Sequence, residues 1–110
     1  MRTSVIVSTF SVERVDGVLR CLRSLSIQRL KPQEIVLVLD PDRELKEFYE
    51  RRIPNNVNLV LSRKRGLSSA RNAGIVGSSG DIVAFIDDDA YADRDWLRNL
   101  ARNYDEPDTV

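Results

Sequence analysis

Histidine is absent from the 110 residues of this chain, and cysteine occurs once, as Cys21. Without histidine the chain cannot form a Ser-His-Asp triad, a Cys-His dyad or a histidine-ligated zinc site. A single cysteine cannot form an internal disulfide, which fits a protein of a reducing compartment. Any catalysis must therefore use carboxylates, arginines, hydroxyls or a hard metal ion.

Long hydrophobic runs are also missing. No run approaches the ~18 apolar residues of a membrane-spanning helix, and the first apolar run, at residues 5–7, is too short for a signal peptide. We therefore expect a cytoplasmic protein, either free or at the inner face of the membrane. The 17 basic and 17 acidic side chains cancel, which gives no general basis for binding nucleic acid. The charge is uneven, however: residues 1–80 carry 14 basic and 8 acidic groups, and residues 81–110 carry 3 and 9.

Short apolar segments alternate with amphipathic ones along the chain. The apolar segments predict strands at residues 4–8, 35–39, 57–61 and 82–86. The other segments predict helices from Ser11 to before Pro32, at 43–52, at 68–76 and from about Asp93. This alternation predicts one α/β domain with a mostly parallel sheet and helices on both faces. Ligands of such sheets bind at the carboxyl ends of the strands, where the strand order reverses.

Three aspartates, Asp87, Asp88 and Asp89, directly follow the fourth predicted strand. Two carboxylates about 5 Å apart repel by roughly 3 kcal/mol at an effective dielectric constant of about 20, so a cation would stabilise the cluster. Ligands that offer only oxygen select hard ions such as Mg²⁺ or Mn²⁺. The alternative is an acidic loop that caps the helix expected from Asp93.

A second motif, residues 66–74, precedes that strand. Gly66 permits a tight approach of the backbone, and Ser68 or Ser69 can cap a helix whose N-terminus favours anions. Arg71, one turn into the helix, can present its planar guanidinium to a pyrophosphate or a base edge. The alternative is a capped amphipathic helix whose arginine pairs with a surface acid.

Asp40 follows the second predicted strand. A carboxylate at this place can accept a hydrogen bond from a ribose hydroxyl or a base N–H. The alternative is an Asx turn that leads into Pro41. Because Asp40, the basic loop at 63–66 and the three aspartates all follow predicted strands, we expect them to meet at one edge of the sheet.

Together, these motifs resemble the family 2 glycosyltransferases, inverting enzymes with the GT-A fold. The similarity covers essentially the whole chain and keeps the order and spacing of the motifs. It is carried by the opening strand at 4–10, the helix and strand at 22–28 and 32–36, the segment 66–74, and the strand with its aspartates at 80–89, followed by Trp96 and Leu97.

The resemblance implies a Rossmann-like GT-A fold and a nucleotide-sugar site for a UDP- or GDP-sugar, with Mn²⁺ or Mg²⁺ as cofactor. The implied roles are as follows: Asp40 contacts the nucleoside, Arg71 the base or the diphosphate, Asp87 the ribose, Asp89 ligates the metal, Asp88 shares either role, and the backbone of Thr9 and Phe10 lines the base pocket. Two departures fall in the nucleoside pocket: segment 39–42 is shifted by about one position, and Lys64 replaces a frequent asparagine. The donor nucleotide therefore stays open.

In the resembled family, the acceptor site and the catalytic base lie in a second half that follows the aspartate-bearing strand. This sequence stops at Val110, about where the next strand is expected. We therefore expect residues 1–110 to be the donor-binding part of a GT-A domain, incomplete at its C-terminus, with no catalytic base to name and with self-association through an open sheet. The alternative is a non-catalytic nucleotide- or metal-binding module that docks onto a partner chain. A phosphotransfer receiver is disfavoured, because the first strand ends in Ser8-Thr9 instead of an acidic pair.

Overall fold

The computed structural model describes residues 2–105, and the strands and helices alternate along them as predicted. The elements are β1 (Thr3–Thr9), the 3₁₀ turn η1 (Val12–Arg14), α1 (Val15–Ser26), β2 (Glu34–Leu39), α2 (Arg43–Glu50), β3 (Val57–Leu61), α3 (Leu67–Val76), β4 (Ile82–Asp87) and α4 (Trp96–Asp105). The helix expected from Asp93 begins three residues later, at Trp96. Asp93 instead forms the preceding turn, where its Oδ1 accepts from the Asp95 N–H at 2.9 Å.

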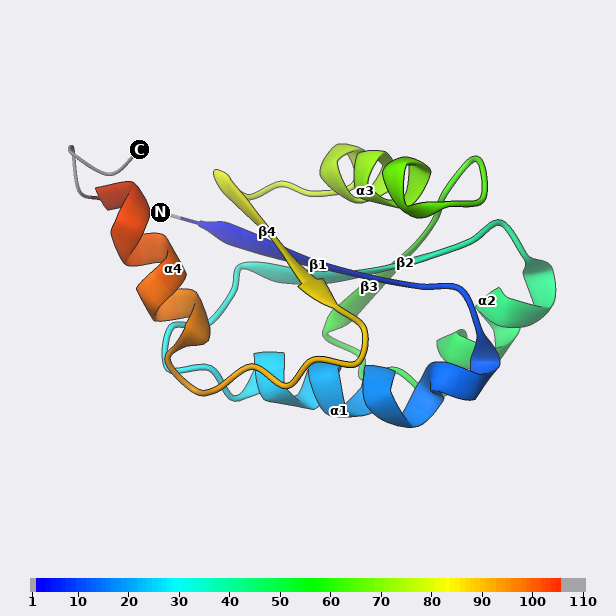
Figure 1. The fold of residues 1–110 in the computed structure, drawn as a ribbon, viewed down its shortest axis with the longest axis horizontal. Helices are drawn as coiled ribbons and strands as arrows, with labels where there is room; N and C mark the ends of the chain where they lie inside the picture. Colours follow the sequence, from blue (N-terminus) through cyan, green and yellow to red (C-terminus); the bar gives the residue numbers. More distant parts are fainter. Residues whose placement is uncertain (1, 106–110) are drawn as a thin grey trace.

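The four strands form one parallel sheet in the order β3-β2-β1-β4. Figure 1 shows α1 and α2 on one face of this sheet and α3 on the other, which confirms the predicted α/β architecture. From β1 the chain moves outward through β2 to β3 and then returns to place β4 on the other side of β1. The strand order therefore reverses between β1 and β4, and a ligand site is expected at the carboxyl ends of these two strands.

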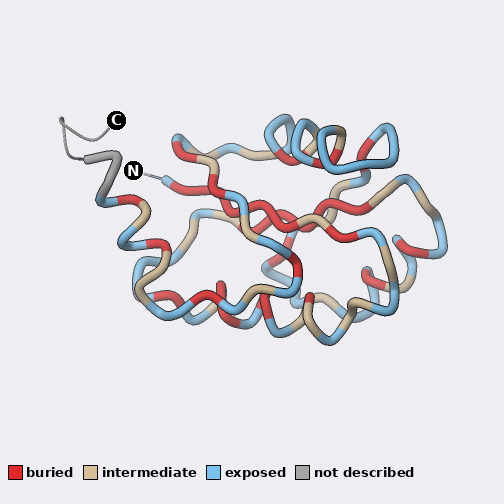
Figure 2. Tube along the Cα trace, viewed as in Figure 1, coloured by how far each residue is buried: buried red, intermediate tan, exposed pale blue. Residues whose placement is uncertain are grey.

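Alternate residues of the central strands fill two cores. The larger core packs Val5 and Val7 of β1 and their neighbours on β2 against α1, α2 and α4. The smaller core packs Ile6 and two β2 valines against Ala70 of α3. Figure 2 shows the resulting continuous burial along β1 and β2. Helix α3 approaches β1 closely at Gly74, where an added Cβ would lie 2.6 Å from the Ile6 Cγ2.

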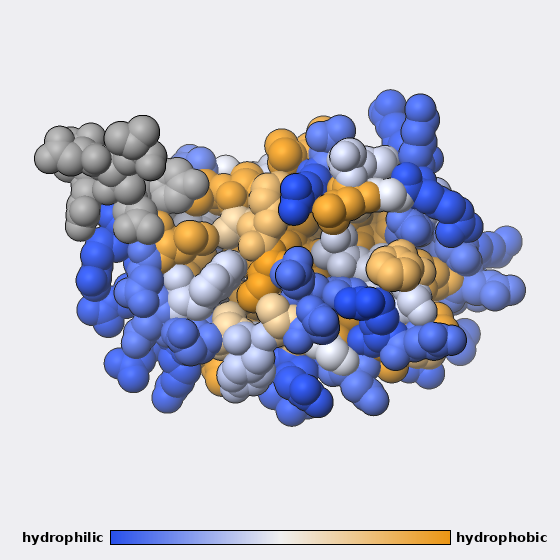
Figure 3. Space-filling view, viewed as in Figure 1, coloured by the Kyte–Doolittle hydropathy of each residue, from blue (hydrophilic) through white to orange (hydrophobic). Residues whose placement is uncertain are grey.

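The β4 edge of the sheet is apolar and exposed. Figure 3 shows hydrophobic side chains over β4 and beside α3, and Phe85, Ile75 and Leu67 are 39%, 50% and 58% exposed. Self-association through this open edge stays a prediction. Within residues 2–105, no helix is long and apolar enough to cross a membrane.

The amino end of the sheet is fastened by the Glu34 carboxylate. It accepts hydrogen bonds from the Ser4 hydroxyl at 2.8 Å, from the Asn58 side-chain amide at 3.3 Å and from both the backbone N–H and the hydroxyl of Ser79. Partial burial raises the pKa of Glu34, but the hydrogen bonds from Ser79, Ser4 and Asn58 outweigh this effect and hold the pKa below its usual value. One charge thus joins β1, β2, β3 and the loop before β4.

Substituting Glu34→Gln removes this charge and keeps the side-chain shape. We expect a loss of about 1–3 kcal/mol in the free energy of unfolding near pH 7, since hydrogen bonds to charged groups are strong. A lowered folded-state pKa stabilises the protein above the unfolded pKa of about 4.3, and this contribution is lost as the pH falls through the folded-state value. Urea denaturation should therefore show the two proteins converging in acid. Glu50→Gln, at an exposed position, is the control, and equal stability of Glu34→Gln and the parent at pH 7 would contradict the prediction.

Candidate functional site

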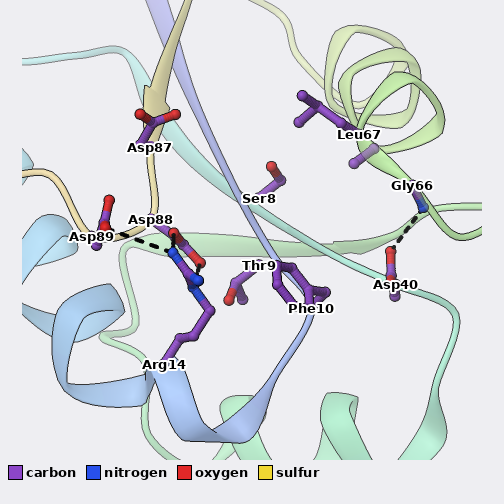
Figure 4. Close-up of a pocket in the computed structure, with 11 residues that line it drawn as sticks. Ser8, Thr9, Phe10, Arg14, Asp40, Gly66, Leu67, Asp87, Asp88 and Asp89 are labelled. Carbon is purple, nitrogen blue, oxygen red and sulfur yellow. Dashed lines mark hydrogen bonds and ion pairs between the residues drawn. The ribbon is translucent and has the colours of Figure 1, made fainter.

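A cavity of about 520 Å³ opens at the carboxyl ends of the strands, where the strand order reverses. We call it the strand-end pocket (Figure 4). Its lining residues are Ser8, Thr9, Phe10, Arg14, Asp40, Gly66, Leu67, Ala70, Asp87, Asp88 and Asp89. Of the seven site residues predicted from the sequence, six line this pocket, and the exception is Arg71.

A second cavity of about 530 Å³ lies between β3 and the side of α3 that faces away from the strand-end pocket. It shares no lining residue with the strand-end pocket, and it contains Arg63 and Lys64 but no carboxylate. The convergence of predicted residues therefore singles out the strand-end pocket.

The end of β1 supplies one wall. Thr9 is 3% exposed and is held in the sheet opposite Leu39, whereas Phe10 is 63% exposed and leaves the strand. An aromatic ring that is this exposed beside a cavity offers a flat apolar surface to a planar ligand.

Asp40 and Gly66 form the second wall. The Asp40 Oδ1 accepts from the Gly66 N–H at 3.4 Å, and its Oδ2 lies 3.9 Å from the Arg65 Nη1. Gly66 has φ +112°, a conformation that favours glycine, and it precedes the first turn of α3. The side-chain turn that the sequence allowed at Asp40 is made instead by Asp42, whose Oδ1 accepts from the Glu44 and Leu45 N–H groups and caps α2. Asp40 is thus left at the pocket.

The expected cap of α3 by Ser68 or Ser69 is wrong. Gly66 is the capping position and makes no side-chain hydrogen bond, while the Ser69 hydroxyl accepts from the Lys64 N–H at 3.1 Å. The left-handed turn at Gly66 folds residue 64 back onto the helix, so that Ser69 closes the loop instead of the helix end.

The acidic loop (Asp87, Asp88 and Asp89) forms the third wall. Asp88 is buried, with 8% of its side chain exposed, and both of its carboxylate oxygens accept hydrogen bonds from Arg14 at 2.7 Å. The Asp89 Oδ2 lies 3.7 Å from the Arg14 Nη2, and its side chain is 70% exposed. The hydrogen bond and the charge of Asp88 raise the pKa of Arg14.

None of these three aspartates caps α4, because the turn before that helix is closed by Asp93. The alternative of a purely helix-capping acidic loop is therefore wrong. The structure also adds a residue that the sequence reasoning missed, Arg14. The sheet topology could have indicated Arg14, because a basic residue shortly after β1 lies at the same end of the sheet as a cluster that follows β4.

Cys21 is fully buried beside the acidic loop. Its thiol donates to the Asp87 carbonyl at 3.5 Å. Burial, followed by the charges of Asp88, Asp89 and Asp87, raises the pKa of the thiol to about 12. A thiol that stays protonated is neither a nucleophile nor a metal ligand at neutral pH.

Arg71 stands outside the pocket lining. It is exposed on α3, with its guanidinium carbon 5.4 Å from the centre of the Phe85 ring of β4. The structure therefore places Arg71 beside β4 and near the pocket. Within the described residues, it makes no hydrogen bond or ion pair with the other predicted site residues.

The pocket fits a divalent cation that is shared with a ligand. Within residues 2–105, no group of three or more acidic or cysteine side chains is arranged to hold a metal ion alone. Mg²⁺ and Mn²⁺ commonly take one or two protein carboxylates and complete their coordination with water and phosphate oxygens. Asp87 and Asp89 supply oxygen donors of this kind, so the chemistry of the site fits a cation bound together with a phosphate-bearing molecule.

Gly66→Ala tests the wall formed at the start of α3. A Cβ at φ +112° is strained even though no atom lies within 4 Å of it, and we expect a loss of about 1–2 kcal/mol in the free energy of unfolding. Ser68→Ala is the matched control: because Ser68 does not cap the helix, its stability should stay within about 0.5 kcal/mol of the parent. A loss near 1 kcal/mol in thermal denaturation of Ser68→Ala would instead indicate a serine cap.

Comparison with known proteins identifies one family. The model of glycosyl transferase family 2 matches residues 4–110. The glucosyl-dolichyl phosphate glucuronosyltransferase of Haloferax volcanii is 35% identical over 114 residues, which cover 100% of this chain and 36% of that protein. The uncharacterized glycosyltransferase EpsJ of Bacillus subtilis is 35% identical, over 94% of this chain and 30% of its own length. The chain thus spans about a third of these relatives.

Solved structures agree with this fold. Staphylococcus aureus TarS 1–349 in complex with UDP-GlcNAc superposes with a TM-score of 0.71 and 28% identity, over 96% of this chain and 31% of that one. The mannosyltransferase PcManGT from Pyrobaculum calidifontis in complex with GDP-Man and Mn²⁺ gives a TM-score of 0.71 and 25% identity, over 96% of this chain and 33% of that one.

Proposed function

This chain belongs to glycosyltransferase family 2, and we propose that its strand-end pocket binds the nucleoside diphosphate of a nucleotide-sugar donor together with Mn²⁺ or Mg²⁺. The observation that carries the proposal is the convergence of Phe10, Asp40 and the acidic loop around one cavity at the reversal of the strand order. Similar structures support it, since TarS was solved with UDP-GlcNAc and PcManGT with GDP-Man and Mn²⁺.

The nucleoside lies, in this proposal, between β1 and the start of α3. The exposed ring of Phe10 and the backbone of Thr9 and Phe10 line the base. The Asp40 carboxylate accepts a hydrogen bond from a base N–H or a ribose hydroxyl, while its bond to Gly66 keeps it at the pocket. Arg71 provides a guanidinium that reaches the base or the diphosphate from the β4 side.

The diphosphate lies between the acidic loop and the N-terminus of α3. Leu67, the first residue of α3, lines the pocket, so the positive end of this helix faces the phosphates. Asp87 binds the ribose, and Asp89 is the ligand of the cation. When bound, the cation stabilises the negative charge that develops on the departing nucleoside diphosphate. We assign Asp88 no ligand contact, because Arg14 occupies both of its oxygens.

The full reaction that we propose is transfer of the sugar from this donor to an acceptor, in keeping with the names of the related glucuronosyltransferase and mannosyltransferase. Residues 1–110 form the donor-binding part in this proposal, and no residue among them is assigned as the catalytic base. A non-catalytic nucleotide-binding module is the competing outcome. An assay for acceptor-dependent release of the nucleoside diphosphate from UDP- and GDP-sugars separates the two.

Cation and nucleotide should bind cooperatively, because the carboxylates alone do not complete a metal site. We expect calorimetry to show that UDP or GDP binds at least about 10-fold more tightly with Mn²⁺ or Mg²⁺ than in EDTA. Asp89→Asn should reduce the affinity to the EDTA value, whereas Asp93→Asn, which keeps an oxygen for its local turn, should leave the cation effect intact. Equal affinity with and without chelator would remove the cation from the proposal.

Arg71→Ala should weaken nucleotide binding without changing the fold, because the side chain is exposed and its recorded contact is the Phe85 ring. Loss of a charge-assisted hydrogen bond corresponds to roughly a 10- to 150-fold loss of affinity. Arg63→Ala, an exposed arginine of the second cavity, serves as the control in the same titration. If Arg71→Ala lowers the melting temperature and leaves the affinity unchanged, Arg71 is structural and leaves the proposed site.

A further inference from the structure

Arg14 connects the two sides of the strand-end pocket. Its guanidinium holds the buried Asp88 through two hydrogen bonds of 2.7 Å, approaches Asp89 to 3.7 Å and lies 5.3 Å from the centre of the Phe10 ring. The residue therefore touches the acidic loop on one side and the aromatic wall on the other (Figure 4).

The backbone that carries Arg14 is anchored in the core. Arg14 ends η1 and is the residue before α1. The Ser11 hydroxyl caps η1 by accepting from the Glu13 N–H at 3.1 Å. The fully buried Tyr49 of α2 donates its hydroxyl to the Ser11 carbonyl at 2.7 Å. These contacts hold the start of the Arg14 side chain at a defined place.

The acidic loop rests on α1 through weaker contacts. The Ala90 N–H donates to the Asp87 carbonyl at 3.1 Å and closes a turn, and the Cys21 thiol donates to the same carbonyl at 3.5 Å. Gly17 of α1 faces the loop, and a Cβ added there would lie in ordinary van der Waals contact with the Asp89 Cα, at 3.5 Å. Asp87 is held by its pairing with Ser8 of β1. For Asp88 and Asp89, which follow β4, the Arg14–Asp88 pair is the strong side-chain link to the rest of the described residues 2–105.

We propose that Arg14 is a positioning residue: through Asp88 it fixes the turn after β4 that presents Asp89 to the pocket, and it gives up its ion pair with Asp89 when the cation arrives. This inference rests on the proposed function. The two ion pairs differ in the way this role requires. The bidentate pair ends on Asp88, whose side chain is only 8% exposed, and its two short hydrogen bonds make it strong. The 3.7 Å pair ends on the 70% exposed Asp89 and is screened and readily exchanged.

Charge gives the physical reason for the exchange. Three carboxylates in one loop repel one another, and a single guanidinium reduces this repulsion while no cation is bound. When a divalent cation binds Asp89, the Arg14–Asp89 contact is no longer needed, and Arg14 still neutralises Asp88. The loop can thus take up the cation without a change in its backbone.

The decisive variant is the double substitution Arg14→Met with Asp88→Asn. Arg14→Met alone leaves a carboxylate buried without its partner and is expected to destabilise the fold. The double variant removes both charges and the fork that positions the loop. Arg14→Lys keeps the charge without the bidentate geometry. Arg29→Met, which breaks an exposed ion pair with Asp95 far from the pocket lining, is the matched control.

Three measurements are made on each purified protein: the melting temperature, the UDP affinity in EDTA, and the Mn²⁺ affinity in the presence of UDP from the electron paramagnetic resonance of free Mn²⁺. For the double variant we expect folding and a UDP affinity in EDTA within about 2-fold of the parent. Its Mn²⁺ affinity should fall by roughly 10- to 100-fold, as it does when the partners of metal ligands are removed. The Mn²⁺ affinity of Arg14→Lys should lie between those of the parent and the double variant, and the Mn²⁺ affinity of Arg29→Met should match that of the parent.

Unchanged Mn²⁺ affinity in the folded double variant would show that Arg14 has a structural role only and would overturn the inference. Loss of UDP affinity in EDTA would overturn it as well, because Arg14 would then contact the nucleotide directly. If the parent itself binds neither UDP nor Mn²⁺, the proposed function fails, and the loop is tested by hydrogen exchange of the Ala90 amide. Faster exchange in the double variant than in Arg29→Met would support positioning by Arg14, and equal exchange would overturn it.

Discussion

The reversal of strand order at β1 is the constraint on which the rest of the structure depends. Because β2 and β4 flank β1 on opposite sides, the loops after these strands diverge and leave a crevice at the carboxyl end of the sheet. Close packing at Gly74 lets α3 cross back over β1 to deliver β4. The Glu34 carboxylate fastens the opposite end, where β1, β2 and β3 begin. One end of the sheet is thus closed by hydrogen bonds, and the other carries the strand-end pocket.

Much of this arrangement follows from sequence pattern alone. The continuous apolar segment at β2 and the alternation of strands and helices predict a parallel sheet, and topology then brings Asp40 and the acidic loop together. The prediction for the first turn of α3 was wrong, because it rested on the preference of serine for helix starts. This preference carries no information on the turn at Gly66, which brings the Lys64 N–H to the Ser69 hydroxyl.

Arg14 escaped prediction for a different physical reason. Its partner Asp88 lies 74 residues away, and local periodicity carries no information on such a pair. The three consecutive aspartates also look equivalent in sequence, whereas the turn after β4 buries Asp88 and leaves Asp87 and Asp89 exposed. A pattern of residues predicts which side chains meet at an edge, but their division into ligands and anchors depends on the direction of each side chain.

The uneven charge of the chain has its structural counterpart in the same pair. The basic excess of residues 1–80 and the acidic excess of residues 81–110 meet where Arg14 contacts Asp88 and Asp89, because β4 returns beside β1. A buried ion pair gives little net stability compared with apolar side chains of the same size. Stability alone therefore does not explain why charge is placed at this point. An apolar pair could fill the space, but it would remove the guanidinium that lies 3.7 Å from the Asp89 carboxylate. The ion pair therefore anchors the turn after β4 to the start of α1 and leaves Asp87 and Asp89 exposed beside the pocket.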